Sequence, residues 1–355
     1  MFSDTIDKRI RLSVIVPVYN AAPYVERCIK CIENQDIPRN VFEIICINDG
    51  STDNSREILI SLQKEFENLI LIDKENQGVS KARNYGIDRA NGKYLMFIDS
   101  DDYVVEDSFE SILQNADNHK AQVSFLGYTS VKEGSKIKER LPAGEQLLHI
   151  YPGTEAYFLS RGAKHTDPDR IWAILFELDF LNRNNLRFLP NVPYLEDGEF
   201  IARILCLAER CIFNNFPFYQ HILRTGSATS SNLFHSEKAT NGFLLAAINL
   251  KRFQKERNLN LVQRDFLNTP VCKFVILVIS STQKPFSLKR INAARIRLAQ
   301  IGLNKLDLAS VNKEYAWLGY FYNSSIYMLI IFQFLINYMR SIRSRFHKIT
   351  DLQQP

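Results

Sequence analysis

Three carboxylates follow a continuously apolar segment, and no other stretch of the chain concentrates as much potential chemistry. Residues 94–98 read Tyr-Leu-Met-Phe-Ile, which predicts a strand buried on both faces, and Asp99, Asp101 and Asp102 come directly after it. In an extended chain the side chains of Asp99 and Asp101 point the same way. Two carboxylates a few Å apart repel each other unless a cation, a proton or hydrogen-bond donors separate them. We therefore expect a divalent cation at this position.

Oxygen ligands select Mg²⁺ or Mn²⁺ over zinc, and these ions keep open positions for water or for the phosphates of a substrate. The segment thus indicates a nucleotide ligand. The alternative is an acidic turn that caps a helix beginning near Val104, because Asp and Ser favour turns and N-caps. The residues of this segment alone leave both interpretations open.

A second carboxylate pair, Glu196-Asp197, precedes an apolar helix that we expect over residues 200–208. Carboxylates are suited to general base chemistry. The alternative is again a helix cap, since acidic side chains stabilise helix N-termini through the helix dipole.

The elements that must position these carboxylates follow an alternating pattern. Short apolar runs and helix-like segments alternate from residue 12 to about 128, which predicts a mostly parallel α/β sheet. The expected strands are 12–16, 42–47, 69–72 and 94–98, and the expected helices are 23–34, 53–66 and 79–90. Ligands of such sheets bind at the carboxyl ends of the strands. That edge would gather the polar segments 17–20, 48–52, 73–78 and 99–102.

Composition restricts the class of protein. A chain of 355 residues with 46% hydrophobic and 23% charged residues can form one large globular domain with an appendage, or two domains. A net charge of +5 is too small to indicate a nucleic-acid partner, and we expect none. The six cysteines lie mostly in apolar segments and are expected to be reduced core thiols. No secretory signal is apparent near the N-terminus, so we expect a cytoplasmic protein.

The C-terminal region is expected to be largely helical after residue 235. Residues 326–336 are apolar except for Gln333, and a basic segment with Arg340, Arg343, Arg345 and Lys348 follows. This apolar run is shorter than the roughly 20 residues that span a bilayer. We expect a helix over 324–348 that lies in the interface of the cell membrane at its inner face, with cations on anionic headgroups. A buried helix with a solvated basic end is the alternative.

Five segments carry a family resemblance. They are Leu12–Asn20, Ile47–Ser55, Asn76–Gly86, Phe97–Asp102 and Glu196–Asp197. In this order and spacing they resemble the motifs of family 2 glycosyltransferases of the bacterial polysaccharide-biosynthesis type. The resemblance is dense over residues 12–104, thinner over 170–230 and absent thereafter.

The resemblance implies a GT-A fold, in which a Rossmann-like sheet binds a nucleotide-diphosphate sugar and the sugar moves to an acceptor hydroxyl with inversion. It implies that Pro17, Tyr19 and Asp49 form the base pocket, with Asp49 accepting a hydrogen bond from uracil. Many relatives carry two acidic residues where this chain has Asn48-Asp49. This departure from the family pattern keeps the expected contact of Asp49 with the base, and the resemblance as a whole implies a UDP-sugar as the donor.

The remaining site residues follow from the same resemblance. Arg83, Ser100 and Arg224 are expected to contact the nucleotide-sugar, whereas Asp99 contacts the ribose or the metal. Asp101 and His221 are the other expected ligands of Mn²⁺ or Mg²⁺. Asp197 is the expected catalytic base and Glu196 the second choice. The resemblance, and not spacing alone, assigns roles to the full set of expected site residues, which is Asp197, Glu196, Pro17, Tyr19, Asp49, Arg83, Asp99, Ser100, Arg224, Asp101 and His221.

We accordingly expect a glycosyltransferase domain over 1–235, with a nucleotide-sugar half at about 10–128 and an acceptor half at 129–235, followed by a helical region over 236–355. The expected activity is metal-dependent transfer of a hexose or N-acetylhexosamine to a growing polysaccharide, such as a capsule or exopolysaccharide, or to a lipid-linked oligosaccharide. A non-catalytic nucleotide-sugar-binding scaffold protein is the alternative. A nucleotidyltransferase fits less well, because residues 14–24 lack the glycines of a phosphate-binding loop.

Overall fold

A computed structural model describes residues 10–132, 135–141, 147–161, 169–192, 194–224 and 232–335. The chain divides into two compact units, Met1–Ser231 and Asn232–Pro355. Each unit is described by itself. The division of the first unit into donor and acceptor halves stays a prediction.

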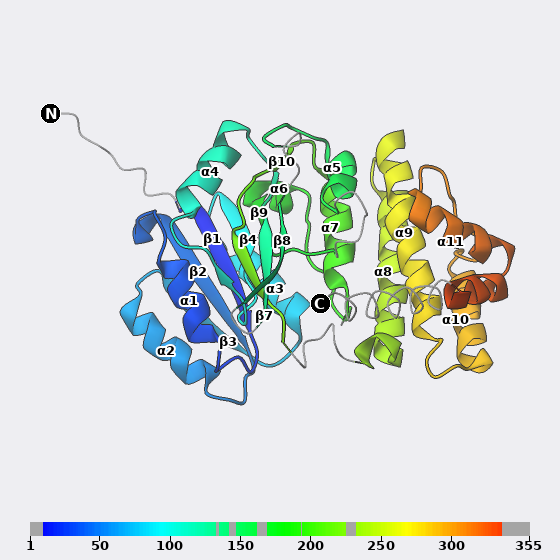
Figure 1. The fold of residues 1–355 in the computed structure, drawn as a ribbon, viewed down its shortest axis with the longest axis horizontal. Coiled ribbons are helices and arrows are strands. Elements are labelled where there is room, and N and C mark those ends of the chain that lie inside the picture. The colour runs from blue at the N-terminus through cyan, green and yellow to red at the C-terminus, as the bar shows by residue number, and fades with distance from the viewer. Residues whose placement is uncertain are drawn as a thin grey trace, which may run out of the picture. The chain divides into compact units, whose positions relative to one another are not determined.

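The first unit is built on a seven-stranded sheet with helices on both faces (Figure 1). Its strands, in spatial order, are β10 (Cys211–Phe213), β6 (Val123–Phe125), β9 (Ile174–Glu177), β4 (Tyr94–Phe97), β1 (Leu12–Val18), β2 (Phe42–Asp49) and β3 (Leu69–Lys74). β1 pairs in parallel with β2 and β4, and β2 with β3, whereas β9 runs antiparallel to both of its neighbours. The sheet is therefore mostly parallel, and every residue of β2 is buried.

Alternation along the strands decides which helix each side chain meets. Val14 and Ile44 belong to the core cluster that also holds the apolar face of α1, whereas Ile45 packs with Ala82 of α3 on the other face of the sheet. The helices of this unit are α1 (Val25–Glu33), α2 (Ser55–Glu65), α3 (Val79–Arg89), α4 (Phe109–Asn118), α5 (Gly153–Leu159), α6 (Leu178–Arg183) and α7 (Glu196–Leu207), with a 3₁₀ turn η1 (Arg39–Val41). All six cysteines of the chain are unpaired, and Cys28 of α1 is part of this core.

A second, four-stranded sheet stands beside the first. Its order is β5 (Tyr103–Val104), β11 (Tyr219–Ile222), β7 (Tyr128–Lys132) and β8 (Ser135–Arg140). β11 pairs antiparallel with β5 and parallel with β7. Because β5 comes directly after the acidic segment 99–102, this pairing brings residues 219–224 to that segment.

The second unit is helical. It contains η4 (Asn232–His235), α8 (Glu237–Glu256), α9 (Leu261–Ser281), α10 (Leu288–Gln300), α11 (Lys313–Ser324) and a helix whose described part is 326–335. Side chains of Ser236, Asn260, Ser287 and Asn312 cap the N-termini of α8 to α11 by accepting a hydrogen bond from a backbone N–H. The sheet and this unit confirm the predicted fold class, a mostly parallel α/β sheet followed by a helical region. None of the described helices is long and apolar enough to cross a membrane.

Candidate active site

The acidic segment begins where β4 ends, at the carboxyl edge of the large sheet. Asp102 is 2% exposed. It accepts hydrogen bonds from the hydroxyl of Tyr219 at 2.8 Å and from the backbone N–H of Ile222 at 2.7 Å. Burial raises the pKa of Asp102, and the charges of Asp99 and Asp101 raise it further. Asp102 therefore anchors β11 to the acidic segment and has no free face for a ligand.

Arg83 joins this segment to the second carboxylate pair. Its side chain, on α3, is buried. Nη1 donates to Oε1 of Glu196 at 2.8 Å and to Oδ1 of Asp197 at 3.1 Å, and Nη2 donates to Oδ1 of Asp99 at 3.1 Å. One guanidinium group thus holds three carboxylates from two distant motifs. We call Arg83, Asp99, Glu196 and Asp197 the carboxylate cluster.

Burial and charge set the protonation states in the carboxylate cluster. Burial lowers the pKa of Arg83, but the carboxylates of Asp197, Asp99 and Glu196 outweigh this effect and raise the pKa above its ordinary value. Burial raises the pKa of Asp197 well above its ordinary value, Arg83 opposes the rise, and Glu196 and Asp99 add to it. A carboxylate whose pKa lies closer to neutrality is a better general base at neutral pH.

The N-terminus of α7 holds Glu196 and Asp197 as its first two residues. Leu195 before them adopts a left-handed conformation with φ of 59°. A Cβ atom on Gly198 would lie 2.4 Å from Oδ2 of Asp169, so a larger residue at this position would displace that carboxylate. The two acidic residues therefore begin a helix, as the capping alternative expected, and also bind Arg83.

Asp101 lies at a more exposed position with cations around it. Its side chain is 25% exposed and forms an ion pair with Arg224. The guanidinium of Arg224 also stacks over the ring of Tyr24, 4.8 Å from its centre. Nη2 of Arg27 donates to the backbone carbonyl of Asp101 at 3.3 Å. Burial and the charge of Asp99 raise the pKa of Asp101, and Arg224 opposes them.

His221 of β11 stacks on Trp172 with 5.0 Å between ring centres. Burial lowers the pKa of His221, although Asp99 and Asp101 oppose this, so the ring favours the neutral form that ligates metals. In the described ranges, His, Cys, Asp and Glu side chains form no group of three or more that could hold a metal. Mg²⁺ commonly binds one or two carboxylates together with substrate phosphates. Asp101, half-buried and repelled by Asp99, suits that mode of binding.

The expected base pocket is only partly free in this structure. Asp49, at the end of β2, accepts hydrogen bonds from the backbone N–H groups of Gln77 at 3.0 Å and Gly78 at 2.8 Å and forms an ion pair with Lys74. Its carboxylate therefore holds the turn that precedes α3. Tyr19, at the end of β1, is 53% exposed and offers an open ring.

Two further expected residues lie at the same edge. Pro17 is half-buried in β1, and Ser100 is buried between Asp99 and Asp101. The structure therefore brings Asp99, Glu196, Asp197 and Arg83 into direct contact and pairs Asp101 with Arg224. The nucleotide and metal contacts of these residues stay predictions.

Sequence reasoning missed three contributors. Lys74 and Arg27 showed no signal beyond their charge, and no role was predicted for Tyr219. Its hydroxyl accepts from the backbone N–H of Asp99 at 3.1 Å and donates to Asp102. Burial and Asp102 raise the pKa of Tyr219, so this hydroxyl keeps its proton. An aromatic residue with a polar tip in a buried strand is the signal that could have found it.

Comparisons with known proteins agree with the motifs. Residues 13–180 match the family described as Glycosyl transferase family 2. The chain is 31% identical over 203 residues to "Uncharacterized glycosyltransferase EpsJ" of Bacillus subtilis (strain 168), and this alignment covers 56% of this chain and 57% of EpsJ. It is 38% identical over 224 residues to "Poly(ribitol-phosphate) beta-glucosyltransferase" of Bacillus spizizenii, and this alignment covers 62% of this chain and 34% of that protein. It therefore aligns with less than two thirds of the length of either relative.

The fold is also similar to a solved structure. TarS of S. aureus, residues 1–349, in complex with UDP-GlcNAc superimposes with a TM-score of 0.68 at 20% sequence identity, over 90% of this chain and 89% of TarS 1–349. This similarity extends over both the sheet and the helical region, and it indicates a common fold.

Proposed function

We propose that this chain, whose residues 13–180 match glycosyl transferase family 2, transfers a sugar from a nucleotide-diphosphate donor to a hydroxyl of a growing polysaccharide or lipid-linked oligosaccharide. The observation that carries this proposal is the carboxylate cluster. It joins Asp99, which follows the central strand β4, to Asp197, which lies 98 positions further along the chain. Donor-binding and base functions need such proximity, because the base must deprotonate the hydroxyl that attacks the anomeric carbon of the bound donor.

The proposed reaction is a single displacement. The acceptor oxygen attacks the anomeric carbon, the bond from that carbon to the diphosphate oxygen breaks, and the nucleoside diphosphate leaves. Asp197 takes the proton of the acceptor hydroxyl, which its raised pKa favours. Glu196 is the second candidate for this role, and Arg83 keeps both carboxylates in place.

Charge on the departing diphosphate needs cations. Asp101, with Asp99 and His221, would hold Mn²⁺ or Mg²⁺, an ion that neutralises the phosphates of such a leaving group. Arg224, already at Asp101, is the protein's own cation for the same purpose. Its side chain is 37% exposed and can exchange the carboxylate for a phosphate.

Uridine is the base that we propose. Tyr19 and Pro17 would contact the ring and Asp49 its N–H group. TarS binds UDP-GlcNAc, which makes UDP-sugars the first donors to test. The name of one relative, Poly(ribitol-phosphate) beta-glucosyltransferase, supports a polymer as the acceptor.

We further propose peripheral attachment to the inner face of the cell membrane. The helix at 326–335 exposes one apolar face, with side chains between 46% and 69% exposed, which consists of Tyr327, Met328, Ile331, Phe334 and Leu335. Aromatic and aliphatic side chains on one helix face are typical of interfacial helices. The part of the expected helix from residue 336 to 348, and its basic residues, lies outside the described residues.

Nucleotide release from a donor panel tests the proposed activity. The full chain would be incubated with UDP-glucose, UDP-galactose, UDP-GlcNAc, UDP-GalNAc and GDP-mannose, with and without Mn²⁺, and free UDP or GDP would be measured. We expect release from at least one UDP-sugar. Saturable donor binding by calorimetry with no release, and no transfer to any saccharide, would instead favour the non-catalytic scaffold protein.

A further inference from the structure

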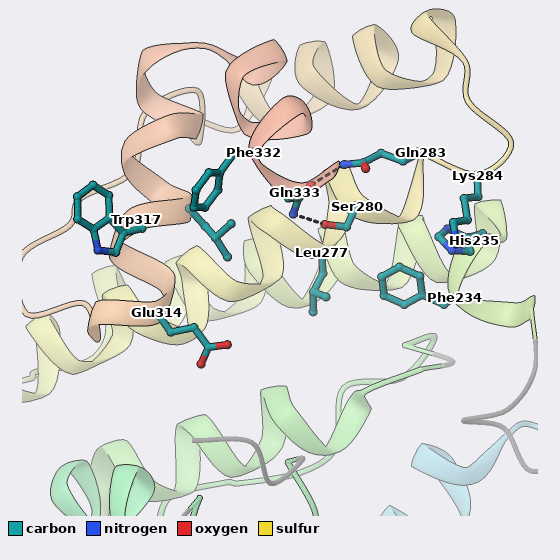
Figure 2. A pocket seen from close by; sticks show the side chains of 11 residues that line it. Phe234, His235, Leu277, Ser280, Gln283, Lys284, Glu314, Trp317, Phe332 and Gln333 are labelled. Carbon is teal, nitrogen blue, oxygen red and sulfur yellow. Dashed lines mark hydrogen bonds between the residues drawn. The ribbon is translucent and has the colours of Figure 1, made fainter. Parts of the chain in front are cut away.

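The helical unit contains a cavity that the proposed reaction does not use. It has a volume of about 530 Å³ and is lined by residues of η4, α9, α11 and the helix at 326–335, with two from the turn after α9 (Figure 2). Small-molecule sites have volumes of roughly 300–1,000 Å³. The cavity is therefore large enough for a ligand and not merely a packing defect.

Aromatic side chains form much of its wall. Trp317 of α11 is 63% exposed, and its ring packs against no other aromatic ring among the described residues. Phe332 and Phe234 also line the cavity (Figure 2). An exposed indole on a cavity wall offers a flat apolar face and an N–H donor at the same place.

Amide and hydroxyl groups form the upper part of the cavity. Nε2 of Gln283 donates to Oε1 of Gln333 at 2.5 Å, and Nε2 of Gln333 donates to Oγ of Ser280 at 2.8 Å (Figure 2). No hydrogen bond from a described residue reaches Oε1 of Gln283. Since an amide offers two N–H donors and an oxygen with two lone pairs, this network can bind further hydroxyl groups.

The charges that line the cavity balance. Glu314 lies at the end that holds Trp317, and Lys284 lies at the other end beside His235 (Figure 2). Neither Glu314 nor Lys284 forms an ion pair with another described residue. Phosphate sites gather several Arg or Lys side chains or helix N-termini, which this cavity lacks in its described lining. A purely apolar ligand would remove Oε1 of Gln283 and both charges from water without giving them new partners, at a large cost.

A neutral ligand with hydroxyl groups and an apolar face satisfies all of these features. We infer that the cavity binds neutral sugar units, with a pyranose face against Trp317 and hydroxyl groups at Gln283 and Gln333. The inference rests on the proposed function in one respect: the saccharide is part of the acceptor chain, away from the reacting hydroxyl.

Fluorine NMR tests this binding directly. The chain has two tryptophans, Trp172 and Trp317, so labelling with 5-fluorotryptophan gives two resonances, and a Trp317→Phe variant assigns them. Maltotetraose, chitotetraose and xylotetraose would be titrated to millimolar concentration without donor. We expect at least one of them to shift the Trp317 resonance saturably and to leave that of Trp172 in place.

A matched pair of variants on α11 supplies the control. Trp317→Ala should weaken binding of the same saccharide about tenfold, because it removes the stacking face, whereas Tyr320→Ala removes an equally exposed aromatic ring outside the cavity lining and should not. Binding to these variants would be measured by calorimetry.

Three results would overturn the inference: no saturable shift with any of the three saccharides, equal weakening by both variants, or a response of Trp317 only to phosphatidylglycerol vesicles. Nucleotide release is assayed separately. A chain that releases UDP but binds no saccharide here refutes only the cavity assignment, and one that binds saccharides but releases no nucleotide refutes only the proposed function.

Discussion

Replacing Arg83 by methionine would remove the cation that Glu196, Asp197 and Asp99 share, while keeping a side chain of similar length. The three contacts are 2.8, 3.1 and 3.1 Å long, and the guanidinium is buried. Removing one partner of a buried charged group costs about 3–5 kcal/mol, because the remaining charges stay desolvated. Here three carboxylates also lose the charge that offsets their mutual repulsion.

The effect should depend on pH. Arg83 lowers the pKa of Asp197, so its loss raises that pKa further above the ordinary value. An opposite charge at this distance shifts a carboxyl pKa by about 1–3 units. The acid limb of the pH profile of kcat should therefore move upward by about 1–3 pH units. A carboxyl pKa that is raised in the folded state costs stability that accumulates as pH rises from the unfolded-state pKa through the folded-state pKa. Arg83→Met should therefore lose more stability at pH 8 than at pH 5.

Two measurements on the purified variant check this. Nucleotide release across pH gives the acid limb, and urea unfolding at pH 5 and pH 8 gives the loss in free energy of unfolding. Arg183→Met is the matched control, since Arg183 forms ion pairs only on the surface with a side chain 61% exposed, and such pairs contribute about 0–1 kcal/mol. An unmoved acid limb, or equal destabilisation at both pH values, would refute the reasoning.

Three other perturbations test separate parts of the account. Tyr219→Phe removes the hydroxyl that joins Asp102 to the backbone of Asp99, and it should lower the free energy of unfolding, measured in urea, by about 1–3 kcal/mol. A change near zero would show that this hydroxyl does not anchor β11 to the acidic segment. Asp101→Asn, or chelation of the wild type with EDTA, should reduce nucleotide release at least about tenfold, and full activity in EDTA would exclude metal dependence. Ile331→Asp with Phe334→Asp, both on an exposed helix face, should reduce co-sedimentation with phosphatidylglycerol vesicles without changing nucleotide release, and unchanged sedimentation would rule out that face as the membrane contact.

Local pattern was enough to predict most of the sheet. The apolar runs at 12–16, 42–47, 69–72 and 94–98 correspond to β1, β2, β3 and β4. β1, β2 and β4 leave a continuous hydrophobic signal because they are buried on both faces, whereas the edge strand β3 is apolar although it is partly exposed. The rule that ligands meet parallel strands at their carboxyl ends then located Asp99 correctly at that edge.

Contacts between distant segments were not predictable in the same way. Arg83 and Asp197 lie 114 positions apart, and nothing in either segment encodes that the arginine would bind three carboxylates. Likewise Asp49 is engaged by the turn at Gln77 and Gly78, a contact that forms only when β2 and the start of α3 are folded together. The two alternatives for Glu196 and Asp197, helix cap and active-site pair, do not exclude each other. Carboxylates in the first turn of a helix stabilise its N-terminus, and the helix fixes their positions at the same time.

The role of Asp197 is tested most directly by comparing Asp197→Asn with Asp179→Asn, which makes the same chemical change at a side chain 70% exposed and outside the carboxylate cluster. Both variants would be assayed for transfer from the active UDP-sugar and for donor binding by calorimetry. A general base contributes typically about 10²–10⁴-fold to the rate, so kcat should fall by that factor in Asp197→Asn alone while donor affinity stays within a few-fold of wild type. Undiminished kcat in Asp197→Asn would contradict the account.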